Sequence, residues 1–171
     1  MHLRIALIAG LLVPLAVTSS SKAESTLTLE KTHLCCGSCV KAANQAVESA
    51  GAKAQIDQKA DKIIITAASD EGAQKAVDAL VTAGFYGKVS GGTIKNDTGV
   101  PAGNVKSLSV ITHNCCKKCS TAINAVVKSV PGVAGEAEPK ADTFTVTGDF
   151  DAAGLVKAFN NTGFSVKVAT K

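Results

Sequence analysis

The chain has no tryptophan, one tyrosine and only 4% aromatic residues in all. Its formal net charge is +4, and its lysines and arginines are not gathered into a stripe. Proteins that bind nucleic acid combine a basic surface with aromatic rings or phosphate-contacting cations. The sequence therefore predicts no nucleic-acid partner.

The patterns that usually mark a catalytic centre are also missing from the chain. We find no phosphate-binding glycine loop, no nucleophile–base pair and no paired acids. Methionine occurs only as Met1, which argues against thioether copper sites. We therefore expect a binding protein and not an enzyme.

Long apolar stretches are lacking except at the N-terminus. Residues 5–17 form an uncharged apolar run that follows Arg4 and precedes a serine-rich stretch ending at Ala23. A basic start, a short apolar run and a small-x-small site are typical of a secretory signal peptide. We expect residues 1–23 to be removed on export to the periplasm or the cell exterior. The remaining chain has no segment long enough to span a membrane.

Cysteine is absent from the chain except in two short strings. All six cysteines lie in THLCCGSC, residues 32–39, and THNCCKKC, residues 112–119, and each string also carries one histidine. Cysteines used for packing would be scattered singly, so two matching clusters indicate one site that was duplicated with its ligands. Because thiolates are soft ligands, the strings predict binding of a thiophilic metal ion.

The two strings open two copies of a longer repeat. Alternating apolar residues precede each string and helically spaced apolar residues follow it, so each string joins a strand to the start of a helix. A hairpin, a second helix and a last strand complete the order βαββαβ, the split βαβ or ferredoxin-like arrangement. The predicted fold class is α+β, with two tandem ferredoxin-like domains at residues 25–89 and 105–169. Residues 90–104, rich in Gly, Asn and Thr, are expected to form a flexible linker.

Each second helix is followed by a Gly-Phe pair. Gly84 and Gly163 are expected to end these helices in the left-handed conformation. Phe85 and Phe164 are expected to be core residues.

The Cys36-x-x-Cys39 and Cys116-x-x-Cys119 pairs, each between a strand and a helix, resemble the loop of the heavy-metal-associated domain. That domain occurs in copper chaperones, P-type ATPase tails and periplasmic mercury-binding proteins, and the resemblance covers nearly all of the chain after residue 23. It implies that both thiols of each pair bind the metal. It further implies sequestration of the ion or its hand-over to a metal-transferring partner protein, with Cu(I) narrowly favoured over Zn(II) and with Hg(II) as a further alternative.

Both strings depart from the usual pattern of that family, which has Met-Thr before the first cysteine. Leu34-Cys35 and Asn114-Cys115 stand there instead, and we expect the leucine but not the asparagine to plug the core beneath the loop. Each copy also has a third cysteine and a histidine. Three thiolates suit trigonal Cu(I) or Hg(II), whereas three thiolates with an imidazole suit tetrahedral Zn(II).

We therefore expect one ion, Cu(I) or Zn(II), per domain, at a Cys-rich loop. The histidines lie on the incoming strands, where they are either direct ligands or residues that only flank the site. The candidate ligands are His33, Cys35, Cys36 and Cys39 in the first domain and His113, Cys115, Cys116 and Cys119 in the second.

Two other uses of the cysteines stay open. A structural disulfide suits an exported protein, but three cysteines per repeat leave one thiol unpaired. A C-x-x-C pair at a helix start is also used by thiol–disulfide oxidoreductases, although the βαββαβ order and the third thiol differ from the thioredoxin pattern. Reduction of insulin would distinguish a redox protein from a metal-binding protein.

Overall fold

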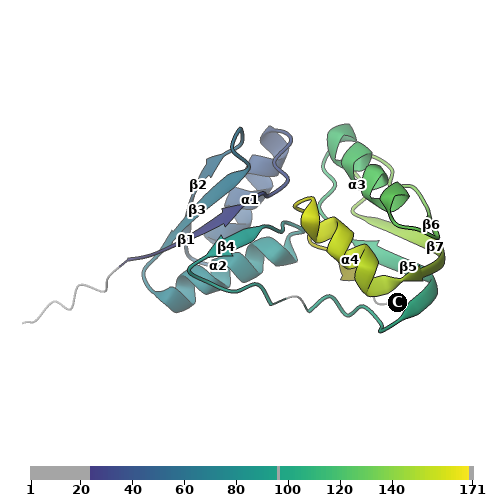
Figure 1. The fold of residues 1–171 in the computed structure, drawn as a ribbon. Helices are drawn as coiled ribbons and strands as arrows, with labels where there is room; N and C mark the ends of the chain where they lie inside the picture. Colours follow the sequence, from purple (N-terminus) through teal and green to yellow (C-terminus); the bar gives the residue numbers. More distant parts are fainter. Residues whose placement is uncertain (1–23, 96, 170–171) are drawn as a thin grey trace, which may run out of the picture.

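The computed structural model describes residues 24–95 and 97–169. The predicted signal peptide, residues 1–23, lies outside the described residues. Figure 1 shows two α+β units side by side, each with a four-stranded antiparallel sheet and two helices. The prediction of two tandem ferredoxin-like βαββαβ units is confirmed.

The first unit has a sheet with the strand order β2-β3-β1-β4. Leu27 pairs with Ile65 and Leu29 with Ile63 across β1 and β3, and these four side chains are buried beneath the helices. Alternate residues of these strands point into the core because the side-chain period of a strand is two. The elements are β1 (Ser25–Glu30), α1 (Gly37–Ser49), β2 (Lys53–Asp57), β3 (Lys62–Ala67), α2 (Asp70–Thr82) and β4 (Lys88–Ser90).

The second unit repeats this architecture with the strand order β6-β7-β5-β8. Val110 pairs with Phe144 and Leu108 with Val146 across β5 and β7, again at buried positions. Its elements are β5 (Asn104–Ile111), α3 (Lys117–Ser129), β6 (Val133–Ala134), β7 (Thr143–Asp151), α4 (Ala152–Asn161) and β8 (Lys167–Val168).

The second helix of each unit begins at a side-chain cap. The Oγ of Ser69 accepts a hydrogen bond of 3.1 Å from the backbone N–H of Gly72, and the Oδ2 of Asp151 accepts one of 2.8 Å from Gly154. Such caps satisfy backbone N–H groups that have no partner inside the helix and contribute about 0.5–2 kcal/mol each. They define the starts of α2 and α4, which are followed at their C-terminal ends by the two Gly-Phe pairs.

The segment between the units is hydrogen-bonded to both of them, whereas the sequence predicted a flexible linker over residues 90–104. Thr93 exchanges two hydrogen bonds with the side chain of Gln74 in α2, at 3.0 and 2.6 Å. Further along, the carbonyl of Thr98 accepts a hydrogen bond of 2.9 Å from the backbone N–H of Val168 in β8. The segment is therefore attached to both units.

The units contact each other at the ends of α2 and α4. Phe85 and Phe164 form an antiparallel backbone bridge, flanked by the bonds Tyr86 N–H to Gly163 O, 3.0 Å, and Ser165 N–H to Gly84 O, 2.9 Å. These contacts place the loop that precedes α1 opposite the loop that precedes α3.

Gly84 and Gly163 have φ of +90° and +84°, as their predicted role of ending the helices requires. They also permit the close approach of the units. A Cβ on Gly84 would lie 2.2 Å from the backbone N of His113, and one on Gly163 would lie 2.4 Å from the backbone N of His33. Any larger residue at either position would push the units apart.

None of the helices within residues 24–95 and 97–169 combines the length and the apolar character needed to cross a membrane.

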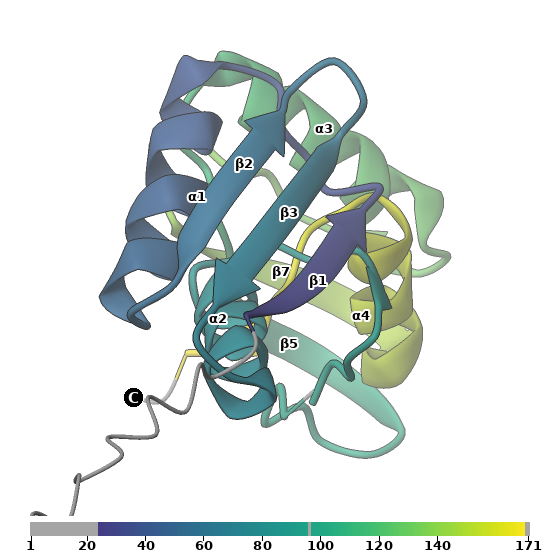
Figure 2. The same cartoon turned by 90° about the vertical axis from the view of Figure 1, so that its left-hand side faces the viewer.

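Figure 2 shows the first unit from its sheet side, with the second unit behind it.

Candidate metal centre

Each cysteine string runs from the end of a strand into the first turn of a helix, as predicted. Cys36 and Cys116 are the N-cap residues of α1 and α3, with extended backbones, and neither side chain caps its helix. Cys39 and Cys119 follow one turn later and are fully buried. The free N–H groups and the positive end of the helix dipole at such a position stabilise thiolate anions.

The six thiols form a single cluster between the two units. The Sγ atoms of Cys35 and Cys119 are 3.4 Å apart, and those of Cys39 lie 3.5 Å from Cys115 and 3.7 Å from Cys119. The Sγ–Sγ distances within one string are no shorter than these distances between strings. The Sγ atoms of Cys35 and Cys39, for example, are 3.7 Å apart. The sequence predicted a separate loop site in each domain, and the structure differs because the docked units place the two loops face to face.

The contacts between the sulfur atoms follow the pattern of an octahedron, with ten of its twelve edges present as contacts and the other two lying between the sequence neighbours Cys35 and Cys36 and Cys115 and Cys116. The contacts between them are 3.4 to 3.9 Å long, and the Sγ atoms of Cys35 and Cys36 are also within 4.8 Å of each other. Apart from cysteines adjacent in sequence, three pairs of these described thiols have no contact and stand at opposite corners: Cys35 and Cys115, Cys36 and Cys119, and Cys39 and Cys116.

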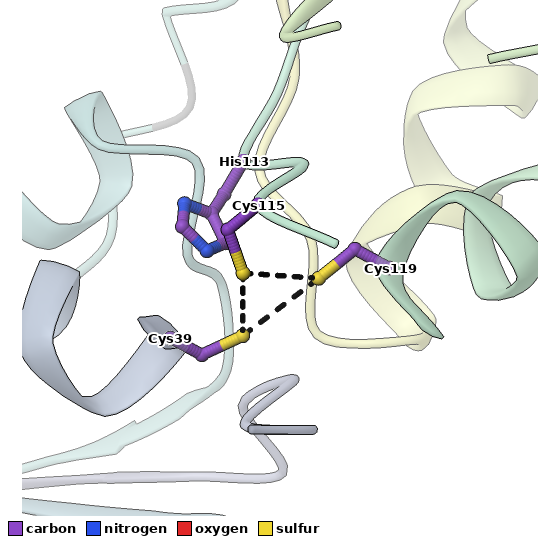
Figure 3. Close-up of side chains that lie close together, drawn as sticks. All are labelled: Cys39, His113, Cys115 and Cys119. Atoms are coloured by element: carbon purple, nitrogen blue, oxygen red, sulfur yellow. Dashed lines mark hydrogen bonds between the residues drawn. The ribbon is translucent and has the colours of Figure 1, made fainter. Parts of the chain in front are cut away.

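A Cys₃His set is present, but it differs from the one predicted within the second domain because Cys39 of the first repeat takes the place of Cys116. A ring nitrogen of His113 and the sulfurs of Cys115, Cys119 and Cys39 all lie within 4.8 Å of one another. Figure 3 shows the three sulfurs as a triangle, with the imidazole of His113 beside it. The first repeat thus contributes one ligand position to a site that is otherwise built by the second.

His33 also lies beside sulfurs from both repeats. A ring nitrogen of His33 and the sulfurs of Cys35 and Cys119 lie within 4.8 Å of one another. The Nε2 atoms of both His33 and His113 are buried without a hydrogen-bond partner. A buried imidazole nitrogen without a partner suits either a metal bond or a hydrogen bond to a ligand sulfur.

Each histidine ring packs against a phenylalanine ring of the other unit. The ring centroids are 4.3 Å apart for His33 and Phe164 and 4.5 Å apart for His113 and Phe85. Both phenylalanines are buried, as predicted, but their contact with the histidines was not foreseen. The only sequence signal was their matching place after Gly84 and Gly163, which identifies a repeated feature without showing what it contacts.

Leu34 and Asn114 occupy the same buried position under the two loops. Leu34 packs into the core, as expected. Asn114 was not expected to fill this place, yet it is fully buried, because its Nδ2 donates to the carbonyls of Glu138 at 2.7 Å and Ala141 at 2.9 Å. The second loop is therefore supported by hydrogen bonds where the first is supported by apolar packing.

The thiols differ in acidity according to their surroundings. Burial opposes ionisation of Cys36, but hydrogen bonds from the Cys39 backbone and from Cys115 and Cys116 outweigh it and lower the pKa of the Cys36 thiol to about 6. Burial raises the pKa values of Cys35 and Cys115. The metal-free cluster consequently contains both thiolates and thiols.

Cys39 and Cys119 face each other at 3.7 Å in the buried part of the cluster. The hydrogen bond between them lowers the pKa of Cys119 and, together with burial, raises the pKa of Cys39. Burial also lowers the pKa of His113, so its imidazole is neutral and able to bind a metal at neutral pH. Metal binding would displace the protons that the thiols retain.

No family model matches the chain, and no curated protein matches it in sequence. Among solved structures, the N-terminal soluble domains of Bacillus subtilis CopA are similar with a TM-score of 0.33 and 12% identity, over 86% of this chain and 95% of that one. The first two RRM domains of the yeast poly(U)-binding protein Pub1 are similar with a TM-score of 0.26 and 11% identity. This match covers 86% of this chain and 100% of that one. At these TM-scores neither likeness carries a conclusion about function.

Proposed function

We propose that the chain is an exported protein that binds Cu(I) at the thiol cluster shared by its two repeats, and that it sequesters the ion or hands it over to a partner protein. The observation that carries this proposal is the single cluster of six sulfurs, in which thiols of both repeats are in mutual contact. Its role is binding and not catalysis.

The spacing of the sulfurs suits metal coordination. With a metal–sulfur bond of about 2.3 Å, the sulfurs of a tetrahedral site are about 3.8 Å apart and those of a trigonal site about 4.0 Å apart. The contacts in the cluster are 3.4 to 3.9 Å long. A metal ion would thus need only small outward movements of the side chains.

The donor set supports Cu(I) over Zn(II). Thiolates on several triangular faces of the cluster offer the all-sulfur, three-coordinate geometry that suits Cu(I). Zn(II) prefers four ligands, and a Cys₃His set is available at Cys39, His113, Cys115 and Cys119. Hg(II) would also suit three thiolates. The preference for Cu(I) therefore rests on the number of sulfur-only faces.

Exposure of the thiols supports transfer of the ion. Cys35 and Cys36, like Cys115 and Cys116, are partly exposed, whereas Cys39 and Cys119 are fully buried. An incoming thiolate from a partner could reach the exposed sulfurs first and replace them one at a time. Export is supported by the signal-like composition of residues 1–23.

The test is a Cu(I) titration of the reduced chain without residues 1–23, under anaerobic conditions and against a chromophoric Cu(I) chelator. We expect the protein to remove Cu(I) from the chelator and to prefer it to Zn(II). The control is a variant with all six cysteines replaced by serine. Equal retention of Cu(I) by both proteins would overturn the proposal, and tighter retention of Zn(II) would overturn the choice of metal.

The same preparation tests the redox alternative. A thiol–disulfide oxidoreductase would catalyse reduction of insulin by dithiothreitol, whereas a metal-binding protein would not accelerate it beyond the six-serine variant. Cleavage after residue 23 and recovery of the protein outside the cytoplasm would test the predicted export.

A further inference from the structure

We propose that the cluster holds four Cu(I) ions at once, with each ion bound by three sulfurs and each sulfur bridging two ions. This inference rests on the proposed function and extends it from one ion per domain to a polynuclear centre shared by both domains. The observation that carries it is the octahedral pattern of contacts among the six thiols.

The first step is geometric. An octahedron has eight triangular faces, and four alternate faces meet only at corners. Every corner belongs to two of these four faces, so six sulfurs supply three ligands to each of four ions with none left over. One such set of faces is Cys39/Cys115/Cys119, Cys35/Cys116/Cys119, Cys36/Cys115/Cys116 and Cys35/Cys36/Cys39. The first two are closed by contacts on all three sides, and each of the other two is closed by two contacts and a pair of sequence neighbours.

The second step concerns the size of these faces. The sulfurs of Cys39, Cys115 and Cys119 are 3.5, 3.7 and 3.7 Å apart, and this is the triangle drawn in Figure 3. Those of Cys35, Cys116 and Cys119 are 3.4, 3.8 and 3.9 Å apart. Because a trigonal ion with bonds of about 2.3 Å needs sulfurs about 4.0 Å apart, both faces accept an ion after slight expansion.

The third step concerns charge. Two of the six cysteines are fully buried and the others are only partly exposed, so uncompensated thiolate charge in the cluster is costly. Four monovalent ions cancel two thirds of the charge of six thiolates, whereas one ion per domain cancels only one third. The nearby cations Lys117 and Lys118 are exposed and screened by solvent. Loading with four ions therefore compensates more of the thiolate charge than loading with one ion per domain.

The geometry also distinguishes Cu(I) from Zn(II) by stoichiometry. Alternate faces supply only three sulfurs to each ion, which suits Cu(I) but leaves Zn(II) short of its fourth ligand. The Cys₃His set can complete a zinc site on one face. We therefore expect four Cu(I) ions per chain and fewer Zn(II) ions.

The test is Cu(I) titration of the reduced chain lacking residues 1–23, followed by native mass spectrometry and X-ray absorption at the copper edge. We expect a monomer carrying four copper ions, with copper–sulfur coordination close to three and clear copper–copper scattering. Saturation at two ions, absence of copper–copper scattering at full loading, or four ions bound only by a dimer would overturn this inference. Failure to retain any Cu(I) against the chelator would instead overturn the proposed function.

A single-residue variant provides a second test. Cys35→Ser removes one corner and so damages two of the four faces, and we expect its capacity to fall below four, towards two. The matched control, Ser38→Ala, changes an exposed residue of the same loop and should keep a capacity of four. An undiminished capacity in Cys35→Ser would contradict the bridging role of its sulfur.

Discussion

The Sγ of Cys35 lies 3.4 Å from the Sγ of Cys119, closer than the 3.7 Å that separates it from Cys39 in its own string. A thiol of the first repeat thus has its nearest contact in the second. This relationship makes the two strings parts of one centre, and it changes what mutation of either string should do.

Removal of the first C-x-x-C pair tests this sharing. For Cys36→Ser combined with Cys39→Ser, we expect Cu(I) capacity to fall by more than half, because both sulfurs also complete faces with cysteines of the second string. Chelator competition would measure the capacity, and circular dichroism would show whether both units stay folded. Retention of half the capacity at unchanged affinity would mean that each repeat has its own site.

The glycines between the units provide a test of docking. Gly84→Ala and Gly163→Ala would each place a Cβ within 2.5 Å of a backbone nitrogen of the other unit. We expect both variants to bind Cu(I) at least tenfold more weakly, because the loops can no longer meet. Metal competition and thermal unfolding would be measured together.

Gly51→Ala is the matched control for these two substitutions. Gly51 also has a positive φ, +76°, but a Cβ there would meet nothing within 4 Å. It should lower stability by about 1 kcal/mol through backbone strain alone and leave Cu(I) binding intact. If it weakened metal binding as much as Gly84→Ala, strain and not docking would explain the loss.

The histidine on the Cys39/Cys115/Cys119 face should matter more to zinc than to copper. His113→Phe keeps an aromatic ring on Phe85 but removes the nitrogen near these sulfurs. We expect Zn(II) affinity to fall by about 10–100-fold and Cu(I) affinity to fall less, because the proposed copper sites are built from sulfur alone. Competition titrations with each metal would measure both changes, and an equal loss for the two metals would contradict this division of roles.

Metal removal should expose the cluster to oxidation across the repeats. When the metal-free chain is treated with diamide, two thiols lose two electrons and two protons to the reagent and form a disulfide. We expect cross-links between the strings, with Cys35–Cys119 prominent because these sulfurs are the closest pair. Peptide mapping would identify the links, and Cu(I) loading should suppress them. Links confined to single strings would show that the loops do not meet in solution.

Local patterns were sufficient to predict most of the fold and to identify the residues of the candidate site. Strand alternation, helical spacing and the caps and stops of the helices depend on neighbours in sequence, so each βαββαβ unit could be predicted in advance. The six cysteines and two histidines were identified because thiols and imidazoles in a duplicated string point to soft-metal chemistry wherever they lie in space.

The sharing of the site could not be predicted from those patterns. It depends on contacts between residues about eighty positions apart, such as the hydrogen bond from the backbone of Ser165 to Gly84 and the stacking of His33 on Phe164. Gly84 shows the difference well. Its place after a helix predicts a left-handed turn, but its close approach to His113 exists only when the two units are docked. The thiol strings carry the metal chemistry, whereas the packing of one unit on the other brings six sulfurs within reach of the same ions.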